Sequence, residues 1–313
     1  MSIRCKRLWV AIAAMCSAAG LIGALVFAQG VVAAQGKNPS QLGDQGLDSE
    51  TDSVARVAAA EAATAGRIVL DLRLVHRQGR PADWAVVTYR REKVSTNDRP
   101  RKEFSEPELL MYAGAAKIYH CVFRSGPLAD PRMKDWSAEA VALECVDLNG
   151  DTVDEVVVTL RRTGASWAPG CAFVFKLASD QLILLAILTS HYEVKIERLD
   201  GYNQPVIPVT FAIGTTLAHV AQPRWTDYYR LDGQRIILAN SVLPQRFQAW
   251  PGTLKNVLTA HPDDPEIWYY LGVARRILGQ GPESERAFAK ARSLGYQEPD
   301  PKAHQAGIQV EQE

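Results

Sequence analysis

Oxygen-bearing side chains are concentrated in one nine-residue segment, 147–155, which reads Asp-Leu-Asn-Gly-Asp-Thr-Val-Asp-Glu. A tight turn brings alternate residues toward one centre, so side chains at the first, third, fifth and ninth positions can converge. These are Asp147, Asn149, Asp151 and Glu155. Three carboxylates and an amide carbonyl, completed by backbone oxygen and water, suit a hard cation with roughly six to eight oxygen ligands.

Calcium fits this donor set best, because magnesium demands stricter octahedral geometry and keeps more of its own water. We expect a single ion with a structural role rather than a catalytic one. The alternative is a turn between two strands that is rich in Asp and Asn and holds no metal.

The segment 145–158 resembles the calcium loop of FG-GAP, or integrin-alpha type, β-propeller repeats. That loop is written D-x-[DN]-x-D-G-x-x-[DE] and precedes a hydrophobic strand. The ligands implied by the resemblance are the side chains of Asp147, Asn149, Asp151 and Glu155 and the backbone carbonyl of Val153. The chain departs from the pattern at Thr152, where the family has Gly. A β-branched residue in the left-handed backbone region costs about 1–2 kcal/mol, so the site is expected to be weak, or empty with the turn held by its own hydrogen bonds.

The residues around this loop follow a two-residue period that is typical of half-buried strands. Turn residues such as Asp200-Gly201 and Asp232-Gly233 separate the runs. The expected strands are 68–75, 84–90, 117–123, 140–146, 155–161, 171–177, 181–188, 206–211, 227–231 and 235–238. The segment 91–110 is charged and contains two prolines, which predicts a long exposed loop. The span 66–245 is therefore expected to be an antiparallel β domain.

Three parts of this domain align as degenerate copies of one unit. Residues 79–91 align without a gap with 150–162, and both keep a turn Gly and a trailing Thr-x-Arg-Arg. Residues 199–209 align with 148–158, and 229–238 align with 175–184. Three units are fewer than the roughly four to eight blades of a closed propeller. The expected architecture is a partial propeller-like arrangement, or a curled sheet or sandwich.

A helical period begins near residue 251. Trp268, Leu271 and Gly272, with Phe288 and Ala291 further on, resemble the core positions of a tetratricopeptide repeat over 253–297. The resemblance departs at two positions, Arg275 and Ser284, where an aromatic residue and Ala are usual. The fold class is thus α+β, with a helical segment at 246–297 after the β domain. A lone repeat must rest on something else, so a cap on the β domain is favoured over a docking surface for a partner.

The beginning of the chain has the layout of a secretory signal. Basic residues precede an apolar stretch at 8–27, and small residues follow at positions suited to a signal peptidase. We expect 1–34 to be a signal peptide, followed by a flexible linker at 35–65 that contains at most a marginal helix. The polar end, 298–313, is expected to fray. The protein is then periplasmic or extracellular; alternatively, an uncleaved signal anchors it in a membrane.

Three cysteines follow the signal, and in an oxidising compartment one pair could form a disulfide bond. The alternative is three small buried side chains. The residues are Cys121, Cys145 and Cys171. Their pairing is open from the sequence.

The composition argues against nucleic-acid binding, because 35 basic and 35 acidic residues balance to a formal charge of zero. The sequence has no zinc-protease, nucleophile-elbow, phosphate-loop or dinucleotide motif. We therefore expect a non-catalytic interaction or scaffold protein with a protein partner, and a membrane contact only through an uncleaved signal. The alternative is an envelope or secreted hydrolase acting on carbohydrate or peptide, with Glu193, Glu197 and Asp200 as candidate carboxylates.

Overall fold

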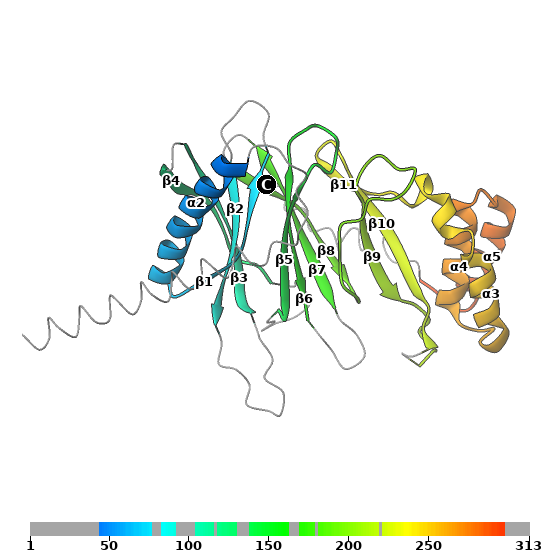
Figure 1. Cartoon of the computed structure of the whole chain (residues 1–313). Coiled ribbons are helices and arrows are strands. Elements are labelled where there is room, and N and C mark those ends of the chain that lie inside the picture. Colours follow the sequence, from blue (N-terminus) through cyan, green and yellow to red (C-terminus); the bar gives the residue numbers. More distant parts are fainter. Residues whose placement is uncertain are drawn as a thin grey trace, which may run out of the picture.

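The computed structural model describes residues 44–76, 83–91, 104–115, 118–129, 138–162, 169–178, 181–218 and 221–297. In these residues the fold is α+β, with eleven antiparallel strands in three sheets and four α-helices (Figure 1). The expected signal peptide, 1–34, and the expected polar end, 298–313, lie outside the described residues. No helix among the described residues is long and apolar enough to cross a membrane.

The first sheet has the order β1-β2-β3-β4. Its strands are β1 (Ile68–Val75), β2 (Asp83–Arg91), β3 (Phe104–Ala115) and β4 (Ile118–Pro127). Strand β3 corrects the expectation of an exposed loop at 91–110, because residues from 104 onward pair with both β2 and β4. The charged residue Glu108 is buried in this strand and is compensated by Arg67 and Arg124, whose nitrogens lie 3.1 Å from Glu108 Oε2.

The second sheet has the order β5-β6-β7-β8. Its strands are β5 (Ala140–Val146), β6 (Glu155–Arg161), β7 (Gly170–Ala178) and β8 (Gln181–Ser190). Val156, Val157 and Val158 are consecutive and all fully buried. Because neighbouring residues of a strand point to opposite faces, this sheet is covered on both sides.

The third sheet has the order β11-β10-β9. Its strands are β9 (Ile207–Ala212), β10 (Arg224–Asp232) and β11 (Arg235–Leu238). All ten strands expected from the sequence are present in the three sheets, with β3 in addition.

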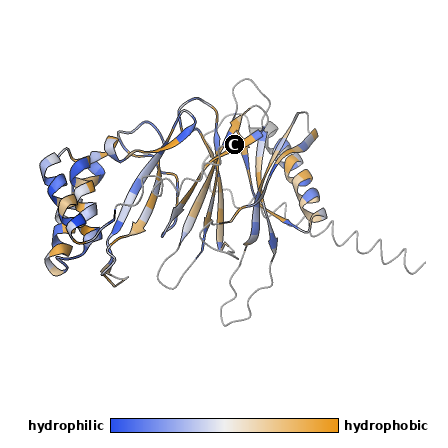
Figure 2. Cartoon of the chain, turned by 180° about the vertical axis from the view of Figure 1, so that it is seen from behind, coloured by the Kyte–Doolittle hydropathy of each residue, from blue (hydrophilic) through white to orange (hydrophobic). Residues whose placement is uncertain are grey.

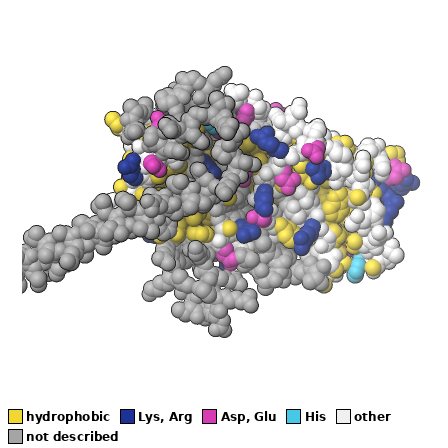
Figure 3. Space-filling view, in the orientation of Figure 1, with side chains coloured by type: hydrophobic (Ala, Val, Ile, Leu, Met, Phe, Trp, Pro, Cys, Tyr) yellow, Lys and Arg dark blue, Asp and Glu magenta, His cyan; other side chains and the backbone are white. Residues whose placement is uncertain are grey.

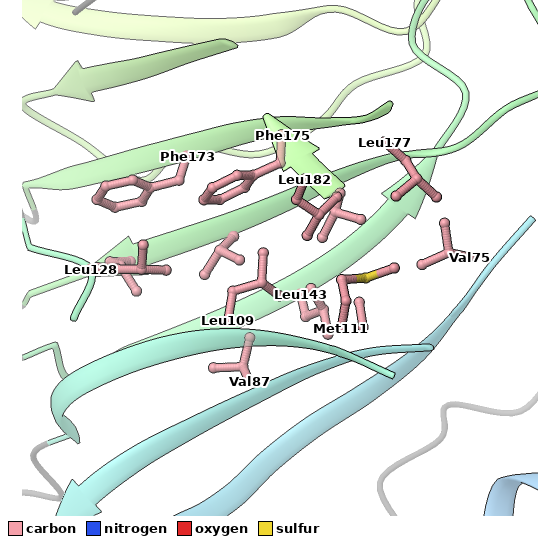
Figure 4. Close-up of a cluster of buried hydrophobic side chains, with 14 of the residues drawn as sticks. Val75, Val87, Leu109, Met111, Leu128, Leu143, Phe173, Phe175, Leu177 and Leu182 are labelled. Carbon is pink, nitrogen blue, oxygen red and sulfur yellow. The ribbon is translucent and has the colours of Figure 1, made fainter. Parts of the chain in front are cut away.

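The three sheets are stacked face to face, and each interface is a separate hydrophobic core (Figure 1). Figure 4 shows the core between the first two sheets, where Val87, Leu109 and Met111 face Phe173 and Phe175. On the far face of the second sheet, Val157 and Val174 belong to a core shared with Ile207 and Val209 of the third sheet. This layered arrangement agrees with the sandwich-like option, and nothing in the described residues closes it into a propeller.

Helix α2 (Asp44–Thr64) covers the outer face of the first sheet. From residue 44 onward it corrects the expectation of a flexible linker at 35–65 with at most a marginal helix, and residues 35–43 lie outside the described residues. Val54, Ala58 and Ala62 lie on one helical face and are buried against sheet residues that include Trp84 and Tyr112. The sequence has few large apolar residues here, but small ones suffice because the sheet supplies the bulky side chains.

Three helices cover the outer face of the third sheet at the opposite end of the stack (Figure 1). They are α3 (Trp250–Ala260), α4 (Pro265–Ile277) and α5 (Gly281–Ser293), and two short 3₁₀ helices, Asn240–Val242 and Pro244–Phe247, precede them. Trp225 of β10 is fully buried among Phe247, Trp250 and Tyr270. The helices at both ends alternate hydrophobic and hydrophilic residues, as expected for elements with one covered face (Figure 2).

A buried carboxylate joins the helical layer to the third sheet. Asp264 Oδ1 accepts hydrogen bonds from the N–H groups of Glu266 and Ile267 and so caps helix α4. Its Oδ2 accepts from the N–H and hydroxyl groups of Thr216, at 3.1 and 2.6 Å. One side chain therefore begins the helix and holds the loop that follows β9.

The two departures from the tetratricopeptide pattern both make contacts between α4 and α5. Ser284 is buried and its hydroxyl donates to the Gly272 carbonyl, at 2.8 Å. Arg275 Nη1 donates to the Glu283 carbonyl, at 3.0 Å. Polar contacts here join two helices that the usual apolar residues would join by packing alone. The assignment to that repeat family stays a prediction.

Candidate metal centre

The segment 147–155 forms the turn between β5 and β6, and the carboxylate of Asp147 organises it. Asp147 Oδ1 accepts hydrogen bonds from the backbone N–H groups of Asn149, Gly150 and Asp151. Asp147 Oδ2 accepts from the N–H of Thr152, at 2.8 Å. A carboxylate that binds several backbone N–H groups fixes the direction of each peptide in the turn.

The side chains of Asn149 and Asp151 each accept one hydrogen bond from the backbone N–H two residues further along the turn. Asn149 Oδ1 accepts from the N–H of Asp151, at 2.8 Å, and Asp151 Oδ1 accepts from the N–H of Val153, at 2.9 Å. Asn149 Nδ2 donates to Asp151 Oδ2, at 3.0 Å. Asn149 and Asp151 are thus in direct contact, whereas Asp147 and Glu155 accept their hydrogen bonds from backbone N–H groups.

The backbone at Thr152 has a φ of 68°, in the left-handed region. The sequence pattern predicts this conformation, since Gly is the usual residue there. The strain of about 1–2 kcal/mol for a residue with a Cβ is opposed by the hydrogen bond from its N–H to Asp147. The turn is therefore compatible with Thr at the position where the resemblance calls for Gly.

Glu155 is the one candidate ligand whose side chain is fully buried. Its Oε2 accepts from the N–H of Leu148, at 2.9 Å, and its Oε1 has no hydrogen-bond partner among the described residues. Burial raises the pKa of Glu155 to about 7, and the nearby carboxylates of Asp151 and Asp147 act in the same direction. A buried carboxylate oxygen without a hydrogen-bond partner is an atom that a cation would satisfy.

A positive charge from the protein itself already lies beside the turn. Lys176 Nζ of β7 is 3.6 Å from Asp151 Oδ2. No group of three or more His, Cys, Asp or Glu side chains in the described part of the chain gathers closely enough to hold a metal ion. The oxygen donors fit calcium chemically, and any ion would have to share Asp151 with this lysine.

The turn also joins the second sheet to both of its neighbours. On one side, His76 N–H donates to Asp154 Oδ2, at 2.9 Å, and Asp154 N–H donates to the His76 carbonyl, at 3.1 Å. On the other side, Gln204 Nε2 donates to the Asn149 carbonyl, at 3.0 Å, and Asn149 Nδ2 donates to the Gly233 carbonyl, at 3.5 Å. The turn is therefore in contact with all three sheets.

Sequence reasoning missed Asp154, Lys176 and Gln204 as parts of this centre. A signal for Asp154 was present, because the gapless alignment of 79–91 with 150–162 places Asp83 opposite it, and both side chains are buried. Lys176 and Gln204 carry no comparable signal. They reach the turn from other strands and loops, through contacts that only the tertiary structure creates.

The candidate hydrolase carboxylates are not gathered at one point with a shared function. Glu193 forms ion pairs with Arg161 and Lys195, at 3.3 and 3.0 Å, and all three side chains are substantially exposed. The backbone of Glu197 pairs with Val206 as an isolated bridge, and Asp200 is exposed in a turn. These are the contacts of a solvated surface.

A shallow hollow of about 580 Å³ lies between the end of α2 and strand β4. It is lined by Glu61, Thr64, Ala65, Cys121, Val122, Phe123 and Arg124. Its one carboxylate, Glu61, accepts a hydrogen bond from the Tyr112 hydroxyl, at 2.7 Å. Two carboxylates facing each other, as in glycoside hydrolysis, are not part of this lining.

No disulfide bond joins Cys121, Cys145 and Cys171 in the described part of the chain. Cys171 is fully buried and belongs to the core between the first two sheets, and Cys145 packs against that core. Burial raises the pKa of both Cys121 and Cys145, which keeps these thiols protonated. Of the two sequence-based alternatives, the structure agrees with small side chains that pack.

The chain matches no protein family, no curated protein and no solved structure.

Proposed function

We propose that this chain is an exported, non-catalytic interaction or scaffold protein with a protein partner, and that the turn 147–155 binds one structural calcium ion. The observation that carries the proposal is the position of the turn. Asp154 contacts the first sheet, while Asn149 contacts the third. A residue set that joins three sheets acts on the stability of the whole stack, which is the expected role of a structural ion site.

Calcium is supported by the unpartnered Oε1 atom of Glu155 and by the local excess of negative charge. The turn contains four acidic residues, Asp147, Asp151, Asp154 and Glu155. Among the described residues, Lys176 forms an ion pair with one of them, Asp151. The ligands would be Asp147, Asn149, Asp151, the Val153 carbonyl and Glu155, as the resemblance implies. The ion would supply positive charge that holds the carboxylates together, with no part in a reaction.

An interaction role is supported by the placement of the exposed apolar side chains. Large hydrophobic residues that are exposed lie on the edge strand β4, β8 or β11 of each sheet, or just after it. They are Ile118, Ile183, Leu184, Leu238 and Val242. On the described part of the face in Figure 3, acidic and basic side chains are intermixed, with hydrophobic side chains between them.

Thermal unfolding of the full chain with calcium, and with a chelator, tests the proposal. We expect calcium to raise the melting temperature by several degrees, because an ion that binds the folded state stabilises it. The variant Asp151→Ala should lose this response. Hydrolysis of glycans or peptides that disappears in a carboxylate variant would refute the non-catalytic role, and equal melting with calcium and chelator would refute the ion.

A further inference from the structure

Lys176 occupies a defined position relative to the turn. It follows Phe175 in β7, and Phe175 pairs with Val156 of β6. Because the strands are antiparallel, Lys176 is opposite Glu155, and the two side chains lie on the same face of the sheet. Its Nζ atom is 3.6 Å from Asp151 Oδ2, and its side chain is 20% exposed. The ammonium is therefore held against the turn but can reach solvent by rotation of its flexible stem.

Glu155 lies in reach of the same charge. Glu155 is the cross-strand neighbour of Lys176, because Val156 and Phe175 pair directly beside them. Glu155 is fully buried and its Oε1 atom lacks a partner among the described residues. One ammonium thus faces more than one carboxylate and leaves at least one acceptor unsatisfied.

The third sheet has a cation in the corresponding position. Tyr229 pairs with Ile207 across β10 and β9, as Phe175 pairs with Val156. Arg230 therefore has the same position relative to the turn before β9 as Lys176 has relative to the turn 147–155. Arg230 Nη1 lies 3.4 Å from Tyr202 Oη and 3.4 Å from Gln204 Oε1, both in the turn before β9. In the alignment of 199–209 with 148–158, Tyr202 and Val206 take the places of Asp151 and Glu155. A basic residue contacts the turn there without any acidic ligand set. The contact is thus a feature of the strand position rather than of metal binding.

We propose that Lys176 is the internal cation of the turn in the calcium-free protein and that it competes with calcium for Asp151 and Glu155. This inference rests on the proposed calcium site. The ammonium neutralises part of the negative charge, so the turn stays folded without metal. When calcium binds, the divalent ion takes its place and the ammonium moves toward solvent.

The expected size of the competition follows from the two charges. An ammonium about 6 Å from a divalent ion weakens ion binding about tenfold even at the dielectric constant of water. A partly buried position is screened less than water, whereas movement of the ammonium toward solvent weakens the repulsion, so tenfold is an order of magnitude. Lys176 then lowers the calcium affinity of this turn by about one order of magnitude.

Calcium chloride titrations of the full chain, followed by melting temperature, test the proposal on the wild type, K176Q and K176R. In chelator, K176Q should melt below the wild type because the carboxylates lose their cation. Its half-maximal calcium concentration should be about tenfold lower than that of the wild type. K176R keeps the charge and should follow the wild type. K195Q, which removes an exposed lysine paired with Glu193, is the matched control and should change neither quantity.

The outcomes separate the two proposals. A calcium response at the same concentration in the wild type and K176Q would refute the competition and leave the calcium site intact. No response in either protein would refute the calcium site and the competition with it. A response in K176Q alone would support the competition and show that the wild-type lysine excludes the ion. K176M keeps the apolar stem and replaces K176Q if the latter does not unfold cooperatively.

Discussion

Replacing Gly272 by Ala should destabilise the helical layer, although Ala is the better helix former. A Cβ at this position would lie 2.7 Å from two atoms of the Phe288 ring and 2.9 Å from a third. Carbon atoms normally stay about 3.5–4.0 Å apart, so the ring would have to move by nearly 1 Å. Phe288 is fixed by Tyr269, whose ring centroid is 5.5 Å away, and by Arg276 above its ring.

The expected loss can be worked out from two opposing contributions. Overpacking of a well-packed core costs roughly 1–3 kcal/mol. Replacing a Gly within a helix by Ala stabilises the folded state by roughly 0.5–1 kcal/mol. The net expectation for G272A is a loss of roughly 1 kcal/mol in the free energy of unfolding, within a range of roughly 0–2.5 kcal/mol.

Gly252 in α3 provides the matched control, because a Cβ there would meet no atom within 4 Å. G252A should therefore gain roughly 0.4–1 kcal/mol, mainly by restricting the unfolded chain. Urea unfolding of both variants measures the difference of roughly 2 kcal/mol, which corresponds to roughly 3–4 °C in melting temperature for a chain of this size. If G272A is as stable as G252A, the close approach of α4 and α5 at this point is wrong.

Three further predictions concern the joints between layers. A58E should lower the melting temperature by several degrees, because Ala58 is buried against the first sheet. A60E, on the exposed face of α2, should have little effect on the melting temperature. Equal effects of the two substitutions would contradict the packing of α2. D154A should cost about 1–3 kcal/mol in urea unfolding, since it leaves the His76 N–H without its acceptor, and the exposed D200A should cost almost nothing. Burial raises the pKa of Glu266 above its ordinary 4.5, so the folded state binds this proton more tightly than the unfolded state and stability should fall as pH rises from about 4.5 through the higher folded-state pKa. This slope should be smaller in E266Q, and an unchanged pH profile in that variant would contradict the assignment.

The sequence predicts the bounds of several strands closely: β1, β5, β6 and β11 have the bounds expected. In β1 the signal is the alternation of apolar and polar residues, whereas β6 is buried on both faces and is marked by its run of three valines. β3 was missed because Glu106, Pro107 and Glu108 precede its apolar part. The charge on Glu108 becomes compatible with a buried strand only through Arg67 and Arg124, which are distant in sequence.

Helix α2 was missed for a related reason. Its buried face consists mainly of Ala, which gives a weak periodic signal, and its stability comes from large residues of the sheet that it covers. The turn 147–155 was easier because its hydrogen bonds are local. The link from Asp154 to His76 and the ion pair to Lys176 depend on how the sheets pack, which no short-range pattern encodes.

The end-to-end order of the layers has a mechanical consequence. α2 lies at one end of the stack and α5 at the other, so tension applied between these helices runs across the layers (Figure 1). The interfaces between sheets are held mostly by apolar side chains, which separate one after another under a peeling load, whereas backbone ladders resist as a group. Such a molecule should yield at its interfaces before any single sheet comes apart. The hydrogen bonds from Asp154 and Asn149 to the neighbouring sheets would then resist the separation of the sheets.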